Sequence, residues 1–175
     1  MKKWISLFTV LTLLVGVTAC GSDKPDDLPV SLDASVSKSG SLLATAGAPQ
    51  TVPVTFELSG FTSVTQYVKY INDADALATS YFEITGIGTS QEVNLTNVSL
   101  SLASDSKKSI SLPDITKNER FTADTSDRLR FMQFVVDEIK REGSSDVTFR
   151  YTPTTNMANV SNKFTLKMDV RFSFD

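Results

Sequence analysis

The stretch Phe-Thr-Leu-Lys-Met-Asp-Val-Arg-Phe-Ser-Phe, residues 164–174, decides the fold class. Its apolar side chains fall at every second position. The positions between them hold Thr165, Lys167, Asp169, Arg171 and Ser173. Successive side chains of a strand point to opposite faces of the sheet. The stretch therefore predicts a strand with one face in a hydrophobic core and the other in water.

The same alternation recurs along the chain and predicts further strands. Its segments are residues 30–36, 52–58, 81–87, 92–103 and 147–151. Two of these segments contain an irregularity. The apolar phase shifts between Leu95 and Val98, which predicts a bulge near residues 96–97. Pro53 lacks the N–H group that a central strand needs, so we expect its strand to lie at an edge.

One segment departs from the β pattern, and we expect an amphipathic helix over residues 127–142. Its apolar side chains repeat at helical spacing and comprise Leu129, Phe131, Met132, Val135, Val136 and Ile139. Residues 124–126 offer three N-cap side chains, and Gly143 stands where a left-handed residue is needed to end the helix. Residues 62–71, by contrast, fit a helix and a strand, so their conformation stays open.

The order of these elements predicts a mainly β fold. About seven short strands, with turn signals between them and no βαβ order, indicate an antiparallel two-sheet sandwich. The helix would close one end of the sandwich or cross between its sheets. The general look is immunoglobulin-like, but the cysteine pair and core tryptophan of immunoglobulin domains are missing. We expect one such domain, residues 30–175, because its length suits a single core.

The N-terminus has the three parts of an export signal. Lysines at positions 2 and 3 begin it, an apolar run covers residues 4–17, and small residues follow. The run is shorter than the roughly 20 apolar residues that a membrane helix needs. A hydrophilic stretch follows at once, so cleavage is favoured over a retained anchor helix.

The tetrad Val17-Thr18-Ala19-Cys20 resembles the bacterial lipobox, which ends in an obligatory cysteine. The resemblance implies that residues 1–19 are removed and that a diacylglycerol is attached to the Cys20 thiol. Cys20 is the chain's one cysteine, so an intramolecular disulfide is excluded. Two or three acyl chains hold a protein on a membrane essentially permanently. We therefore expect a bacterial lipoprotein with the membrane as one partner.

Residues 20–29 would then be the lipidated N-terminus and a polar, proline-punctuated tether. Nine such residues reach about 30 Å when fully extended. The acids Asp23, Asp26 and Asp27 follow Cys20, and this cluster resembles the surface-export signal of lipoproteins in the Bacteroidota. The resemblance, to small envelope lipoproteins of that group, implies an outer-membrane location. It favours the cell surface over the periplasm.

The charge of the chain disfavours nucleic acid as a partner. The sequence has 17 Lys and Arg against 20 Asp and Glu, and removal of the two leader lysines leaves 15 against 20. A nucleic-acid binder needs clustered cations that replace phosphate counterions, whereas the cations here are scattered among acids.

Enzyme chemistry finds little support in the sequence. The chain contains no histidine, which removes the commonest general base, the Ser-His-Asp arrangement and the usual zinc ligands. We expect no cofactor and no enzymatic activity. A pair of carboxylates could still hydrolyse a glycoside, but sequence spacing cannot select the pair.

Three weak candidate sites remain. Asp73 and Asp75 could meet a calcium ion in a loop, although the other ligands and the glycine of a calcium loop are missing, so a polar turn is favoured. Tyr67 and Tyr70 could flank a glycan groove, but aromatic residues of a β domain more often pack in its core. Arg128 and Arg130, with the lysines at positions 107 and 108, could form a small basic patch. The nearby Asp127 and Asp105 favour a solvated surface of mixed charge instead.

These observations lead to one main functional hypothesis. We expect a lipid-anchored, non-enzymatic accessory domain that offers a sandwich surface or a sheet edge to a protein partner in the envelope. A surface glycan-binding module is the alternative, and a carboxylate hydrolase is the third.

Overall fold

A computed structural model describes residues 24–42, 45–87, 94–156 and 162–175. Its strands are β1 (Ser31–Ser41), β2 (Gln50–Glu57), β3 (Ile71–Ala76), β4 (Tyr81–Thr85), β5 (Leu95–Leu102), β6 (Ser109–Ser111), β7 (Glu119–Thr122), β8 (Ser144–Pro153) and β9 (Lys163–Phe174). Its helices are the 3-10 segments η1 (Leu58–Gly60) and η2 (Thr62–Tyr70) and the α-helix α1 (Ser126–Glu142). Within these ranges, no helix is long and apolar enough to cross a membrane.

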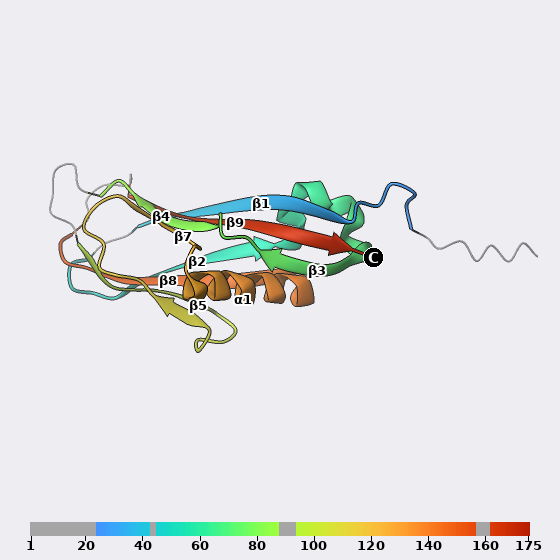
Figure 1. Cartoon of the computed structure of the whole chain (residues 1–175). Helices are drawn as coiled ribbons and strands as arrows, with labels where there is room; N and C mark the ends of the chain where they lie inside the picture. The colour runs from blue at the N-terminus through green and yellow to red at the C-terminus, as the bar shows by residue number, and fades with distance from the viewer. Residues whose placement is uncertain (1–23, 43–44, 88–93, 157–161) are drawn as a thin grey trace, which may run out of the picture.

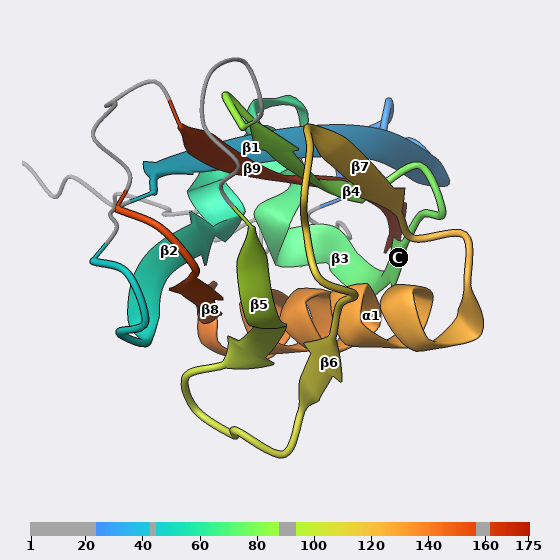
Figure 2. The same cartoon turned by 90° about the vertical axis from the view of Figure 1, so that its left-hand side faces the viewer.

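The strands form two antiparallel sheets that face each other (Figures 1 and 2). One sheet has the order β1-β9-β4-β7, with β3 paired to β9, and the other has the order β2-β8-β5-β6. The pairing is nested, since the first strand pairs with the last and the second with the last but one. This is the strand order of a jelly roll, in which a long hairpin is rolled into two sheets. The predicted two-sheet antiparallel sandwich is confirmed.

Strand β9 lies at the centre of its sheet. Strand β1 pairs with one side along its whole length, while β4 and β3 share the other side end to end. Between them, the Ser80 hydroxyl donates to the Asp169 carbonyl at 3.1 Å and accepts from the Asp169 N–H at 2.9 Å. The serine side chain thus takes the place of a strand residue where β3 ends and β4 has not begun.

Alternation in β9 correctly predicts the core face but not the exposure of one residue on the other face. Its apolar side chains, from Phe164 to Phe174, are all buried between the sheets. Phe164 packs 5.1 Å from Phe149 of the facing sheet, centroid to centroid. Asp169, expected in water, is only 8 % exposed. Its carboxylate can be buried because Lys167, Ser35 and Thr79 bond to it and offset the cost of removing its charge from water.

Both irregularities predicted in the strands are confirmed. The register of β5 on β8 shifts between Thr96 and Ser99, and Asn97 within this shift has a left-handed φ of 53°, as found in one class of bulge. Pro53 lies in β2, which is an edge strand of its sheet. Its missing N–H therefore costs the sheet no internal hydrogen bond.

Helix α1 begins and ends where the sequence predicts. The Thr125 hydroxyl accepts from the Arg128 N–H at 3.4 Å, and Gly143 ends the helix with a φ of 81°. The helix packs against β3 of one sheet and against β6 and β8 of the other (Figure 2). It thereby crosses between the sheets and covers the side of the sandwich on which they would otherwise stand open.

The structure settles the segment that the sequence leaves open. Residues 62–70 form the 3-10 helix η2, in which Val64 is fully buried. Strand β3 follows directly, so the chain turns from helix to strand at Ile71. Three short strands, β3, β6 and β7, have no alternation long enough to be recognised in the sequence.

Candidate functional site

The structure does not describe the predicted lipidation site. Cys20 and the acidic residue Asp23 lie outside the described residues, while Asp26 and Asp27 are exposed. The described chain enters the domain next to its C-terminal strand, because the Phe174 N–H donates to the Val30 carbonyl at 3.1 Å. A tether that ends at Val30 would therefore join the sandwich at the end where β1 begins and β9 finishes (Figure 1).

The two tyrosines proposed for glycan binding pack against the domain. Both lie in η2, and both are partly buried against the hydrophobic core. The Tyr67 ring meets Phe174 edge to face, with 5.5 Å between centroids. The Tyr70 carbonyl accepts the Asp175 N–H at 3.0 Å. Their packing ties η2 to the end of β9.

The acids proposed as calcium ligands lie in a strand, not in the loop that the sequence suggested. Asp73 and Asp75 belong to β3, where residues two apart share one face. The Lys140 ammonium bonds to the Asp73 carboxylate at 3.0 Å. This bond, with the Ala74 N–H, lowers the pKa of Asp73 below its usual value. Among the described residues, no group of three or more acids, cysteines or histidines could hold a metal ion.

A hollow of about 270 Å³ beside the end of α1 gathers three carboxylates, those of Glu138, Glu142 and Asp146. Each of them has an internal partner. Serine hydroxyls from positions 104 and 145 bond to the two oxygens of the buried Glu138, Arg141 pairs with Glu142, and Thr55 donates to Asp146. The bonds of Glu138 join α1 to β8 and to position 104, just beyond the end of β5, whereas those of Glu142 and Asp146 stay within α1 and between β2 and β8. Each carboxylate thus has a structural role in the fold.

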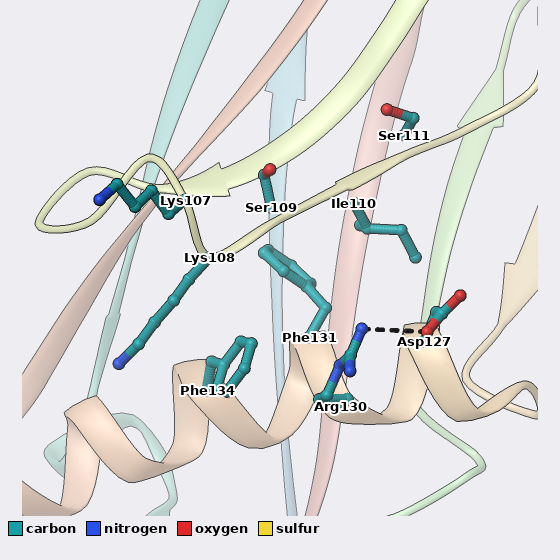
Figure 3. A pocket seen from close by; sticks show the side chains of 9 residues that line it. All are labelled: Lys107, Lys108, Ser109, Ile110, Ser111, Asp127, Arg130, Phe131 and Phe134. Carbon is teal, nitrogen blue, oxygen red and sulfur yellow. Dashed lines mark hydrogen bonds and ion pairs between the residues drawn. The ribbon is translucent and has the colours of Figure 1, made fainter.

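A larger hollow, which we call the β6–α1 groove, lies between β6 and the first half of α1 (Figure 3). Its volume is about 470 Å³, within the usual range of ligand sites. The residues that line it are Lys107, Lys108, Ser109, Ile110, Ser111, Asp127, Arg130, Phe131 and Phe134. The groove thus joins two segments that are about twenty residues apart in the sequence.

Positive charge dominates the β6–α1 groove. Three cations line it, and Asp127, the one acid among the described lining residues, pairs with Arg130 at 3.1 Å (Figure 3). Within the described part of the chain, no carboxylate lies within ion-pair distance of Lys107 or Lys108. The whole chain carries a net charge of −3. The groove therefore has the opposite sign from the protein around it.

The floor of the β6–α1 groove is apolar. Phe131 is buried beneath it, whereas Ile110 and Phe134 remain partly exposed. The Lys108 ammonium lies 5.2 Å from the centroid of the Phe134 ring, a cation–π distance that holds the lysine at the rim. The groove can receive a ligand that combines negative charge with an apolar group.

The sequence drew attention to the cationic residues of this site but did not predict that they border a groove. Lys107, Lys108 and Arg130 belong to the possible basic patch that the sequence ranked below a solvated mixed surface, and the structure brings them together around one hollow. Arg128 lies apart from them, because its guanidinium covers the Phe121 ring and bonds to Asp124. The partly exposed Ile110 and Phe134 were missed. In the sequence, Ile110 follows two lysines, which hints at a surface position, whereas nothing beside Phe134 does so.

Comparisons with known proteins add a likeness of fold. No protein-family model matches the chain, and no curated protein matches it at a significant level. A BFDV capsid protein, solved as a decamer, is 10 % identical with a TM-score of 0.42, covering 81 % of this chain and 98 % of its own. The structure of desmodium yellow mottle tymovirus is 11 % identical with a TM-score of 0.37, covering 99 % and 93 %. Likenesses this weak carry no argument about what the chain does.

Proposed function

We propose that this chain is a lipid-anchored, non-enzymatic accessory protein of a bacterial envelope and that its sandwich domain binds a partner protein. The observation that carries the binding role is the β6–α1 groove, a cationic and partly apolar hollow on an acidic domain. A positively charged groove on a negatively charged domain favours partners that present negative charge there, and it speeds their encounter.

The anchor rests on the tetrad Val17-Thr18-Ala19-Cys20 and its resemblance to the lipobox. Lipid on Cys20 would keep the domain within about 30 Å of the headgroups, because the tether is short. The acids that follow Cys20 favour the outer face of the outer membrane. Such a position suits a protein that works beside other envelope proteins.

The non-enzymatic part of the proposal rests on the residues available for chemistry. The chain has no histidine, and the carboxylates that share the hollow beside Glu138 already bond to serine, threonine and arginine side chains. A free acid and a free base facing one cleft are what a glycosidase needs. We therefore rank the hydrolase below the binding roles.

A glycan-binding role is the second candidate, with a different site from the one first expected. Tyr67 packs against Phe174 and so lends little support to a tyrosine platform. The partly exposed Phe134 beside three cations would instead suit an acidic sugar. We favour a protein partner because the groove also borders a strand edge.

Capture of partners from detergent-solubilised envelope tests the proposal. Wild-type protein should label with palmitate, fractionate with the outer membrane and recover the same partner repeatedly, whereas Cys20→Ser should lose label and membrane association. A protease added to intact cells should degrade the protein if it faces outward. Recovery of the protein alone, together with a specific hit on a glycan array, would replace the main proposal with the second candidate.

A further inference from the structure

We infer that the β6–α1 groove binds an extended, acidic segment of the partner protein, which adds a strand to β6. This inference rests on the proposed function and names the chemistry of the partner. It combines three features of the groove: an open strand edge, unpaired cations at the rim and an apolar floor.

The strand edge follows from the hydrogen bonds of β6. The Lys108 carbonyl accepts from Leu102 at 3.0 Å, and the Leu112 N–H donates to Val98 at 2.8 Å, so positions 108 and 112 face β5. Backbone groups alternate sides along a strand, so those of Ser109 and Ser111 point away from β5. Among the described strands, β5 alone pairs with β6. These backbone groups can therefore pair with an incoming strand.

The cations select the sign of that strand. Lys107 and Lys108 precede β6, and Arg130 faces the same groove from α1 (Figure 3). A peptide laid along Ser109–Ser111 would pass between them. Acidic side chains on it would meet the two lysines, for which the described residues supply no carboxylate. Basic side chains there would be repelled, which gives the groove its specificity.

The floor explains why an apolar residue should accompany the acids. Ile110 and Phe134 are partly exposed above the buried Phe131. An apolar side chain that covers them removes apolar surface from water, which favours binding. Side chains of an added strand point alternately to opposite sides. Lys108 and Ile110 lie two residues apart and so share the side of β6 that faces α1, whereas Lys107 extends away from Ile110 (Figure 3). A segment of alternating acidic and branched apolar residues would thus rest its apolar side chains on Ile110 and Phe134. Its acidic side chains would turn to the other side, toward Lys107, with Lys108 at the border.

Fluorescence anisotropy with labelled peptides tests this inference on the full-length lipoprotein in detergent. The probes are short peptides of alternating glutamate and valine, the same peptide with glutamine or lysine in place of glutamate, and an N-methylated form that cannot pair as a strand. We expect tight, salt-sensitive binding of the first alone. Equal binding of the lysine or the N-methylated peptide would overturn the inference, as would binding of polygalacturonate in place of any peptide.

Two groove variants locate the binding. Lys108→Glu and Arg130→Glu should each weaken binding of the glutamate–valine peptide by roughly tenfold or more. Lys163→Glu makes the same charge change on an exposed residue at the start of β9 and serves as the matched control. Circular dichroism should report the same fold for all three. Unchanged binding by both groove variants would overturn the inference.

The same variants separate this inference from the proposed function. If a partner captured from the envelope is lost with Lys108→Glu and kept with Lys163→Glu, both stand. If the captured partner is kept by both groove variants, the accessory role survives while the groove is not its contact site.

Discussion

The Asp169 side chain of β9 bonds to Ser35 of β1 and to Thr79 before β4, and its ionisation makes the stability of the fold depend on pH. Burial by itself raises the pKa of Asp169, but hydrogen bonds from Lys167, Thr79 and Ser35 outweigh burial and lower it below the usual value. A group whose pKa is lower in the folded protein stabilises the fold at neutral pH. That contribution is lost as the pH falls below about 4.

Asp169→Asn should therefore lower the free energy of unfolding at pH 7 by roughly 1–3 kcal/mol, the usual cost of losing hydrogen bonds to a buried charged group. The difference in unfolding free energy from wild type should narrow at pH 3, because this pH lies below the ordinary pKa of aspartate, so that the unfolded wild-type chain takes up a proton that its folded form resists. Urea unfolding at both pH values measures this. Asp33→Asn, which removes the exposed partner of Arg171, is the control and should cost less at pH 7. An equal gap at both pH values would contradict the explanation.

At the scale of single elements, Gln133 protects the outer edge of β3. Its side-chain amide accepts the Ala76 N–H at 2.8 Å and donates to the Ala74 carbonyl at 2.9 Å. The amide group therefore mimics a strand peptide unit supplied by a helix. An open edge would invite pairing with other chains, and here α1 closes it.

Gln133→Ala should remove both bonds and leave the edge of β3 solvated. We expect faster hydrogen exchange at the Ala76 amide, with a loss of about 1–2 kcal/mol in global stability. The control is Asp137→Ala, which removes only the bond from Gln133 to its helical neighbour at 2.8 Å. If exchange at Ala76 changes equally in both variants, the edge contact has no special role.

Local signals explain which elements could be predicted from the sequence. A few adjacent residues determine each of the features that were predicted, namely the caps of α1, the bulge at Asn97 and the alternation of β9. Strand β6 has only three residues and exists because β5 lies beside it, a contact that no local pattern encodes. The β6–α1 groove was missed for the same reason. Its cations were visible in the sequence, but their convergence depends on how α1 packs against β6.

At the scale of the whole molecule, the point where the proposed tether would join the domain predicts an orientation relative to the membrane. One end of the domain brings together Val30, the end of β9 and η2. At that end, the Gly143 carbonyl after α1 accepts the Leu58 N–H at 2.8 Å. The groove flanks the first half of α1, which lies farther from that end than Gly143 does (Figure 1). Lipid on Cys20 would thus hold the groove farther from the membrane than the start of β1.

Site-specific fluorophores can measure this orientation, because Cys20 is the chain's one cysteine and its thiol would be blocked by lipid. Val30→Cys and Lys108→Cys each add one reactive thiol, and Val30 is 86 % exposed. On phosphatidylcholine vesicles with nitroxide headgroups, quenching should be strong at position 30 and weak at position 108, because the tether reaches only about 30 Å. Protein that never received lipid should show no quenching at either position. Equally strong quenching of the two labelled, lipidated variants would mean that the domain lies flat, with its groove facing the headgroups instead of a protein partner.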